Sequence, residues 1–255
     1  MDSTLINKKH KKQKWKYVEI RERDLGLFKA ILMQKFLKRD LAIKWIFKGD
    51  ESYAAVRLRK LKMFSYLKGV QILVGQPESY LLLEKGVEAL RSAGYPVGAG
   101  NLGLPAPQSF IELSTYEHDF KVAEARFLFE TMEFCKDWKS EKMLKMGTQG
   151  EKKVPDGFFT RNGRGIAVEV ELHPKKSETY RKIFEIYEDD PKVHYIFYLC
   201  GGLSLMRKIM KLTEDGGRKV YCFALYENFI KYQAETVFKA THPEREFKIK
   251  AVIKK

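Results

Sequence analysis

Residues 154–173 impose the strongest constraint on the fold, because they predict two strands joined by a tight turn. The first run, VPDGFFT, is short and mostly apolar, and Asn162 and Gly163 follow it, a pair that adopts positive φ at little cost. Residues 166–173 (IAVEVELH) then alternate strictly between two faces, which is the periodicity of a strand. The segment therefore predicts an antiparallel hairpin.

Three acidic residues lie on this hairpin. Glu169 and Glu171 are two positions apart, so both carboxylates project from one face of their strand. Asp156 lies on the preceding strand and can approach Glu169 across the turn. Carboxylates that converge in this way repel each other unless a cation lies between them, and oxygen ligands suit Mg²⁺ or Mn²⁺. The pattern predicts a metal site, and such a metal can lower the pKa of a bound water and stabilise charge on a phosphorane-like transition state.

The rest of the second half predicts an α/β unit with a mixed sheet. Antiparallel strands come first and a parallel crossover comes later, in the order α-β-β-β-α-β-α-β. The expected helices are 116–134, 176–189 and 203–212, and the further strands are 138–145, 193–200 and 219–230.

The first half predicts three helices followed by a hairpin. The helices are expected at 21–37, 38–47 and 52–67, the hairpin strands at 69–75 and 78–83, and a last helix at 84–95. Asp24 is the expected N-cap of the first helix, and either Asp50 or Ser52 is the expected N-cap of the third. Val56, Leu58, Leu61 and Phe64 are the expected buried residues of the third helix. The layout resembles a winged helix-turn-helix, whose third helix enters the major groove of DNA.

Charge points to the same partner for this half. The chain has 48 Lys and Arg against 33 Asp and Glu, a net charge of +15, and residues 1–100 carry +11 of it. Such asymmetry is typical of a polyanion-binding segment, so we expect double-stranded DNA as the partner. The expected DNA-binding residues, from the basic tail, the third helix and the hairpin, are Lys11, Lys12, Lys14, Arg57, Arg59, Lys60, Lys62 and Lys68.

Composition also suggests the boundaries. We expect a basic tail (1–18), a winged helix DNA-binding domain (19–95), a linker rich in Gly and Pro (96–109) and the α/β domain (110–255).

Pro155-Asp156 followed by Glu169-Val170-Glu171 resembles the motif of the PD-(D/E)xK nuclease superfamily, and the predicted order of elements resembles its restriction-endonuclease-like core. The resemblance implies that Asp156 and Glu169 bind the metal, joined by an acid of the first helix, with Glu124 chosen over Glu117. The family usually has Lys where this chain has Glu171. The resemblance implies that Glu171 itself, or a lysine moved to the following helix, acts there. The candidates are Lys175, Lys176 and Lys182, and Lys182 is the best placed because it lies on the helix.

The longer series of motifs is similar to the replication-relaxation family of plasmid and mobile-element proteins. The series comprises a winged helix, His118-Asp119, WKSE (138–141), PDG (155–157), VEVE (168–171) and Lys182 with Tyr187. The resemblance covers roughly residues 20–200. It implies DNA binding and a role in plasmid replication or mobilisation, without itself establishing cleavage.

Two functions of different classes follow. The first is a Mg²⁺-dependent DNA endonuclease with Asp156, Glu169, Glu171 and Lys182 as its catalytic residues. The second is a regulator of replication or transcription that uses an inactive nuclease-like domain for binding or dimerisation. RNA binding is the least favoured alternative, because no RNA-binding motif is found.

The remaining expectations concern cellular location, membrane contact and oligomeric state. The three cysteines, Cys135, Cys200 and Cys222, follow no CxxC spacing and indicate reduced thiols in a cytoplasmic protein. No apolar run is long enough to span a membrane, so we expect no membrane contact. A homodimer is a further expectation.

Overall fold

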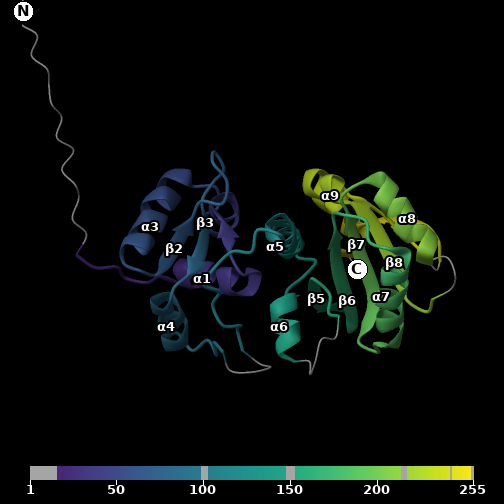
Figure 1. Cartoon of the computed structure of the whole chain (residues 1–255), viewed down its shortest axis with the longest axis horizontal. Coiled ribbons are helices and arrows are strands. Elements are labelled where there is room, and N and C mark those ends of the chain that lie inside the picture. Colours follow the sequence, from purple (N-terminus) through teal and green to yellow (C-terminus); the bar gives the residue numbers. More distant parts are fainter. Residues whose placement is uncertain (1–15, 99–102, 148–152, 214–216, 242, 254–255) are drawn as a thin grey trace, which may run out of the picture.

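The computed structural model describes residues 16–98, 103–147, 153–213, 217–241 and 243–253. Two units follow each other along the chain (Figure 1). We call residues 16–95 the N-terminal unit and the described residues from 110 onward the C-terminal unit. Lys11, Lys12 and Lys14 lie outside the described residues.

The N-terminal unit combines helices with a small antiparallel sheet, whose order is β1-β3-β2. Its elements are α1 (Glu22–Gln34), β1 (Leu37–Lys38), α2 (Arg39–Leu41), a π-helical turn (Ala42–Ile46), α3 (Glu51–Met63), β2 (Leu67–Val70), β3 (Ser79–Leu82) and α4 (Glu84–Ser92). The predicted first, third and last helices and the hairpin are present. The predicted helix 38–47 is instead the end of β1, the short α2 and the π-helical turn, and the first hairpin strand begins two residues earlier and ends five residues earlier than expected.

The two predicted helix caps have different outcomes. Asp50 caps α3 as predicted, because its carboxylate accepts a hydrogen bond from the backbone N–H of Tyr53 at 2.9 Å. Asp24 is not the N-cap of α1, which begins after Arg21. Asp24 lies in the first turn instead, where its buried carboxylate accepts from the backbone N–H of Arg21 at 2.8 Å.

The C-terminal unit is built on a seven-stranded mixed sheet of order β10-β9-β8-β7-β6-β5-β4. Strands β6, β7 and β8 are mutually parallel, and the other neighbours pair antiparallel. The elements are α5 (Tyr116–Thr131), β4 (Lys139–Ser140), α6 (Glu141–Met146), β5 (Gly157–Arg161), β6 (Arg164–Glu171), α7 (Ser177–Asp189), β7 (Val193–Cys200), α8 (Leu203–Thr213), β8 (Val220–Leu225), α9 (Tyr226–Tyr232), a 3-10 turn (Gln233–Glu235), β9 (Val237–Ala240), β10 (Arg245–Lys248) and α10 (Ile249–Ile253). The mixed α/β class is confirmed.

Three sequence predictions need correction in this unit. The expected strand 138–145 is a two-residue strand followed by α6, because the lysine-rich run EKMLKM lacks the β-branched residues of a strand. The expected strand 219–230 ends at Leu225 and continues as α9. Strands β9 and β10 were not predicted at all.

Both faces of the large sheet are covered by other side chains. Ile166, Val168 and Val170 pack in the larger core cluster, whereas Ala167 packs with residues of α7 and α8 in a second cluster. Figure 1 shows α7 and α8 on one side of the sheet. The alternation of β6 is real, but its acidic face is buried and not open to solvent.

The two units share one hydrophobic core. The larger cluster runs from Leu27 of α1 to Ile249 of α10. Aromatic pairs join the units: Phe36 stacks on Tyr116 with ring centroids 5.0 Å apart, and Trp45 stacks on Phe127 at 5.7 Å. The N-terminal unit therefore packs firmly on α5.

Among the described residues, no helix is long and apolar enough to cross a membrane.

Candidate functional site

Asp156, directly before β5, and Glu169, on the neighbouring strand β6, form what we call the carboxylate pair. Gly157 pairs with Val168 in the β5–β6 register, which brings the two acidic residues opposite each other. Both are buried, with 7% and 4% of their surface exposed. Asp156 Oδ2 accepts a hydrogen bond from the backbone N–H of Val170 at 2.8 Å. The predicted approach of Asp156 to the Glu169 strand is confirmed.

The pair shares negative charge in a poorly solvated place. Burial, with the nearby Asp156 charge added, raises the pKa of Glu169 above its ordinary value. Burial also opposes ionisation of Asp156, but the contact with His118 and the charge of Lys153 outweigh it and lower the pKa of Asp156. Two close carboxylates of this kind attract a cation.

Lys153 supplies one such cation. Its ammonium group lies 2.9 Å from Glu169 Oε1 and 3.1 Å from Oε2. Burial alone would lower the pKa of Lys153, but Glu169 and Asp156 raise it above its ordinary value, so the ammonium form dominates. The Tyr187 hydroxyl, buried on α7, donates to Glu169 Oε1, the oxygen that also lies closest to the Lys153 ammonium group.

Glu171 forms its ion pair with a different lysine. Its carboxylate is buried and pairs with Lys175, four residues further along the chain. Lys182, the predicted lysine of the site, is exposed on α7. Within the described ranges, no hydrogen bond or ion pair joins Lys182 to a carboxylate of the site. The lysine that contacts the carboxylate pair is Lys153, not the predicted Lys182.

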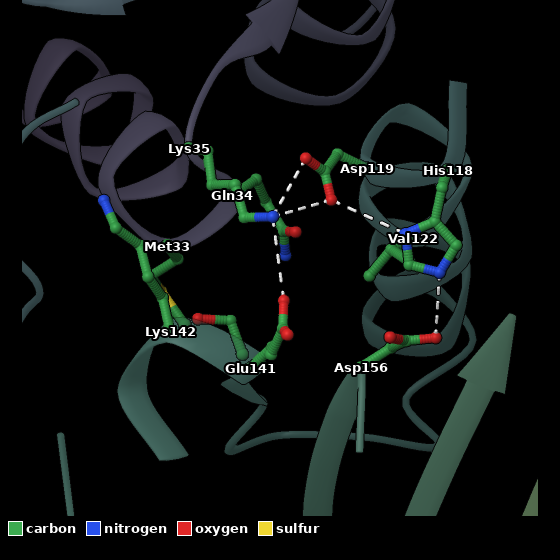
Figure 2. Close-up of a pocket in the computed structure, with 10 residues that line it drawn as sticks. Met33, Gln34, Lys35, His118, Asp119, Val122, Glu141, Lys142 and Asp156 are labelled. Carbon is green, nitrogen blue, oxygen red and sulfur yellow. Dashed lines mark hydrogen bonds and ion pairs between the residues drawn. The ribbon is translucent and has the colours of Figure 1, made fainter. Parts of the chain in front are cut away.

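A second line of charges extends from Asp156 toward the N-terminal unit (Figure 2). His118 Nε2 lies 3.2 Å from Asp156 Oδ2, and His118 Nδ1 lies 3.5 Å from Asp119 Oδ1. Lys35 contacts both oxygens of Asp119, at 2.8 and 2.9 Å, and Glu141 at 3.6 Å. Burial disfavours the charged imidazole, but the two aspartates outweigh it and raise the pKa of His118 to about 10.

A small cavity of about 20 Å³ adjoins these charges. Two buried polar atoms of its lining residues, Gln34 Nε2 and Ser140 Oγ, have no hydrogen-bond partner. The cavity is large enough for one water molecule. The residues that line it are Met33, Gln34, Lys35, His118, Asp119, Val122, Ser140, Glu141, Lys142 and Asp156.

The acid predicted from the first helix of the α/β unit does not join this network. Glu124 accepts a hydrogen bond from the Tyr226 hydroxyl at 2.7 Å, which directs its carboxylate toward α9. Glu117 is largely exposed and lies near Lys121. The residues of α5 that contact the site are His118 and Asp119, which precede Glu124 on the helix.

The donor set limits which metal the site can hold. The described residues contain no group of three or more His, Cys, Asp or Glu side chains placed to bind a metal ion. The carboxylate pair alone remains, and Mg²⁺ is commonly held by one or two protein carboxylates with water completing its shell. Asp156 and Glu169 are therefore compatible with Mg²⁺ or Mn²⁺, whereas Glu124 does not contribute.

The predicted DNA-binding residues of α3 divide into two groups. Arg57 is buried, its guanidinium pairs with Asp24, and it also donates to the Glu19 carbonyl oxygen at 2.6 Å. Arg57 is therefore not available to DNA, because moving its guanidinium group away would leave the buried Asp24 carboxylate unpaired. Val56, expected in the core, is 47% exposed, while Leu58 and Leu61 are buried as predicted and Phe64 is half-buried.

The remaining basic residues lie nearer the surface. Arg59 and Lys68 are exposed, and Lys60 is half-buried. Lys62 pairs with Glu78 of the hairpin at 2.7 Å, so it links α3 to the segment before β3. These positions keep a basic surface on the N-terminal unit, without Arg57.

Lys35, Lys153 and Glu141 were not identified from the sequence. Lys153 stands three residues before Asp156, and its closeness to the motif was the one signal that could have indicated it. Lys35 carries no such signal, because its approach depends on how the two units pack. Glu141 ends the WKSE motif (138–141), but that motif gave it no role in the site.

Comparison with known proteins gives no relative: no family model matches the chain, and neither a curated protein nor a solved structure is similar enough to count as a match.

Proposed function

We propose that this protein is a Mg²⁺- or Mn²⁺-dependent DNA endonuclease whose N-terminal unit binds duplex DNA as a winged helix. The observation that carries the proposal is the buried carboxylate pair, Asp156 and Glu169, with the Lys153 ammonium group against it. Two acids and a lysine brought together at β6 and the segment before β5 resemble the metal-binding and catalytic residues of the PD-(D/E)xK nucleases.

The arrangement of the N-terminal unit supports DNA binding. A basic helix, α3, precedes an antiparallel hairpin and a final helix, which is the order of a winged helix-turn-helix. Arg59 and Lys68 are exposed on this unit, and the first 100 residues hold most of the excess positive charge. Positive charge of this kind neutralises backbone phosphates and steers the protein to DNA.

The order of elements in the C-terminal unit supports the nuclease assignment. Helix α5, the strands β4 to β6, helix α7 and strand β7 reproduce the α-β-β-β-α-β order of the PD-(D/E)xK core, with α6 added. The same order, with the winged helix before it, supports membership of the replication-relaxation family and a role on plasmids or mobile elements.

Each residue of the site has a chemical role in this proposal. Asp156 and Glu169 would hold the divalent ion, which lowers the pKa of a bound water and stabilises charge on the reacting phosphate. Lys153 orients the attacking water through its ammonium group, the task expected of Lys182 from the sequence. Tyr187 holds Glu169 in place by donating to its carboxylate.

A nicking assay tests the proposal. Supercoiled plasmid is incubated with the full chain and Mg²⁺ or Mn²⁺, and open-circular and linear products are counted. We expect cutting by the wild type and by Glu117→Gln, a matched control at an exposed acid of α5, and no cutting by Asp156→Asn. Identical behaviour of the wild type and Asp156→Asn would refute the nuclease assignment.

A second candidate function rests on a different observation. Asp156, Glu169 and Asp119 each already have a protein cation beside them, namely His118, Lys153 and Lys35. Such internal neutralisation favours a winged-helix regulator in which the nuclease-like unit serves binding or dimerisation. Undiminished DNA binding together with no cleavage in any divalent metal would select this function.

A further inference from the structure

Lys35 has an unusual backbone conformation at the end of α1. Its φ is 71° and its ψ is −46°, although it is neither glycine nor asparagine. This region is rare and strained for a residue with a Cβ, and such strain persists only where the surroundings hold it in place. The conformation turns the chain out of α1 into the strand that begins at Leu37, and the Lys35 side chain extends toward the C-terminal unit (Figure 2).

The partners of Lys35 all belong to that other unit. Its ammonium group contacts the two carboxylate oxygens of Asp119, on α5, and lies 3.6 Å from Glu141, at the start of α6. Only a quarter of the Lys35 side chain is exposed, so the ion pairs are poorly screened by solvent. Thr115 adds a hydrogen bond to Asp119 at 2.9 Å.

Asp119 links Lys35 to the candidate site through His118. Lys35 and His118 approach the Asp119 carboxylate from opposite sides (Figure 2). The other nitrogen of the His118 ring lies 3.2 Å from Asp156. The N-terminal unit is therefore connected to the carboxylate pair through two side chains.

The surroundings give this ammonium group a specific task. Without it, Asp119, Glu141 and Asp156 would be three carboxylates around a cavity that also holds two unpartnered buried polar atoms, Gln34 Nε2 and Ser140 Oγ. Three acids in so small a volume repel each other and would separate or take up protons. Lys35 and the His118 imidazolium are the cations that contact these acids, and Lys35 is the one that the N-terminal unit contributes.

We propose that Lys35 is a positioning residue: its ammonium group, contributed by the N-terminal unit, fixes Asp119 and His118 and so holds Asp156 in place. The part of this inference that concerns catalysis rests on the proposed nuclease function. The structural part, that Lys35 fixes the His118 ring, does not. One consequence is that the C-terminal unit is an incomplete site without the N-terminal unit.

Three variants of the full chain test the proposal. Lys35→Met removes the charge, Lys35→Arg keeps it, and Lys44→Met removes an exposed charge of the same unit that lies over Trp45 and away from the cavity lining. The first readout is the proton signal of the His118 ring, measured by NMR and assigned by its loss in His118→Gln. The second readout is steady-state cleavage of plasmid DNA, separated into kcat and KM.

We expect the His118 signal to move in Lys35→Met, to move little in Lys35→Arg and to stay unchanged in Lys44→Met. We expect kcat of Lys35→Met to fall roughly 10- to 100-fold with KM for DNA unchanged, since loss of a supporting contact behaves in this way. Lys35→Arg should recover part of the rate.

The outcomes separate the two proposals. An unchanged His118 signal in folded Lys35→Met overturns the positioning role, whether or not the protein cuts DNA. A moved signal in a protein that never cuts supports the positioning role and refutes the nuclease function. If the wild type cuts and Lys35→Met cuts at the same rate, the role of Lys35 in catalysis is refuted. Should Lys35→Met not fold, Lys35→Gln gives the same comparisons.

Discussion

Lys153 places its ammonium group 2.9 Å from Glu169, from a segment that precedes β5. The lysine beside the carboxylate pair therefore comes from the segment before β5 and not from α7, where Lys182 lies. Glu171, at the position where the PD-(D/E)xK motif that this segment resembles has lysine, pairs separately with Lys175. The carboxylate pair therefore has a lysine, Lys153, beside it even though position 171 is Glu and not Lys.

This relationship leads to a first prediction. Lys153→Met should abolish cleavage, or reduce it by a factor of 10² or more, because it removes the group that orients the attacking water. Lys182→Met is the matched control and should cut at the wild-type rate. Plasmid nicking measures both variants, and circular dichroism checks that they fold. Loss of activity in Lys182→Met with an active Lys153→Met would reverse the assignment.

A second prediction concerns stability and DNA binding on α3. Arg57→Met leaves the buried Asp24 carboxylate unpaired, and we expect a loss of about 3–5 kcal/mol in the free energy of unfolding. Adding Asp24→Leu should restore much of it, since both charges are then gone. Urea denaturation measures these changes. A stable Arg57→Met protein with weakened DNA binding would show that Arg57 faces DNA.

A third prediction concerns the exposed part of the same helix. Arg59→Ala should weaken binding to duplex DNA and reduce the slope of log affinity against log salt by about one, as expected for one lost phosphate contact. Its stability should stay within about 0.5 kcal/mol of wild type, as for most surface substitutions. Fluorescence anisotropy at several salt concentrations measures the slope. Equal slopes for Arg59→Ala and wild type would exclude Arg59 from the interface.

The predictable part of the fold is the part fixed by local pattern. The alternation of β6, the turn at Asn162 and the cap at Asp50 are signals within a few residues, and each has its counterpart in the structure. Strands β9 and β10 were missed because they are short and polar, with only Phe238, Ala240 and Phe247 directed into or against the core.

The candidate site shows the same division. Asp156 and Glu169 are brought together by hairpin register, which sequence spacing predicts. Arg57 was taken for a surface residue because a helix with four basic residues has the appearance of a basic face. Its pairing with Asp24, 33 residues earlier, depends on how α1 and α3 pack. Lys35 and Asp119 are 84 residues apart, and no local pattern indicates such a contact.

A fourth prediction follows from the charge of His118. Burial opposes the imidazolium form, but Asp119 and Asp156 raise its pKa to about 10 in the folded protein, against about 6.5 in the unfolded chain. A raised pKa stabilises the fold fully below pH 6.5, and the stabilisation is lost as pH rises toward 10. We expect a loss of about 1–2 kcal/mol across this window, discounted because a third of the ring is exposed. Urea denaturation should show a smaller change in the free energy of unfolding between pH 6 and pH 9.5 for His118→Gln than for the wild type. An equal change in the two proteins would contradict the raised pKa of His118.

The last prediction uses two glycines. A Cβ on Gly157, directly after Asp156, would lie 1.8 Å from the Trp138 ring, which is buried. Gly157→Ala must therefore displace Trp138 or the β5 strand, at a cost of about 1–3 kcal/mol. Gly26 lies in α1 with no atom within 4 Å of the added carbon, so Gly26→Ala should stabilise the protein by up to about 1 kcal/mol. Thermal unfolding should order the three proteins as Gly26→Ala, wild type and Gly157→Ala. Because Gly157 adjoins Asp156, Gly157→Ala should also lose cleavage of DNA. A Gly157→Ala protein as stable and as active as Gly26→Ala would show that β5 does not pack against Trp138.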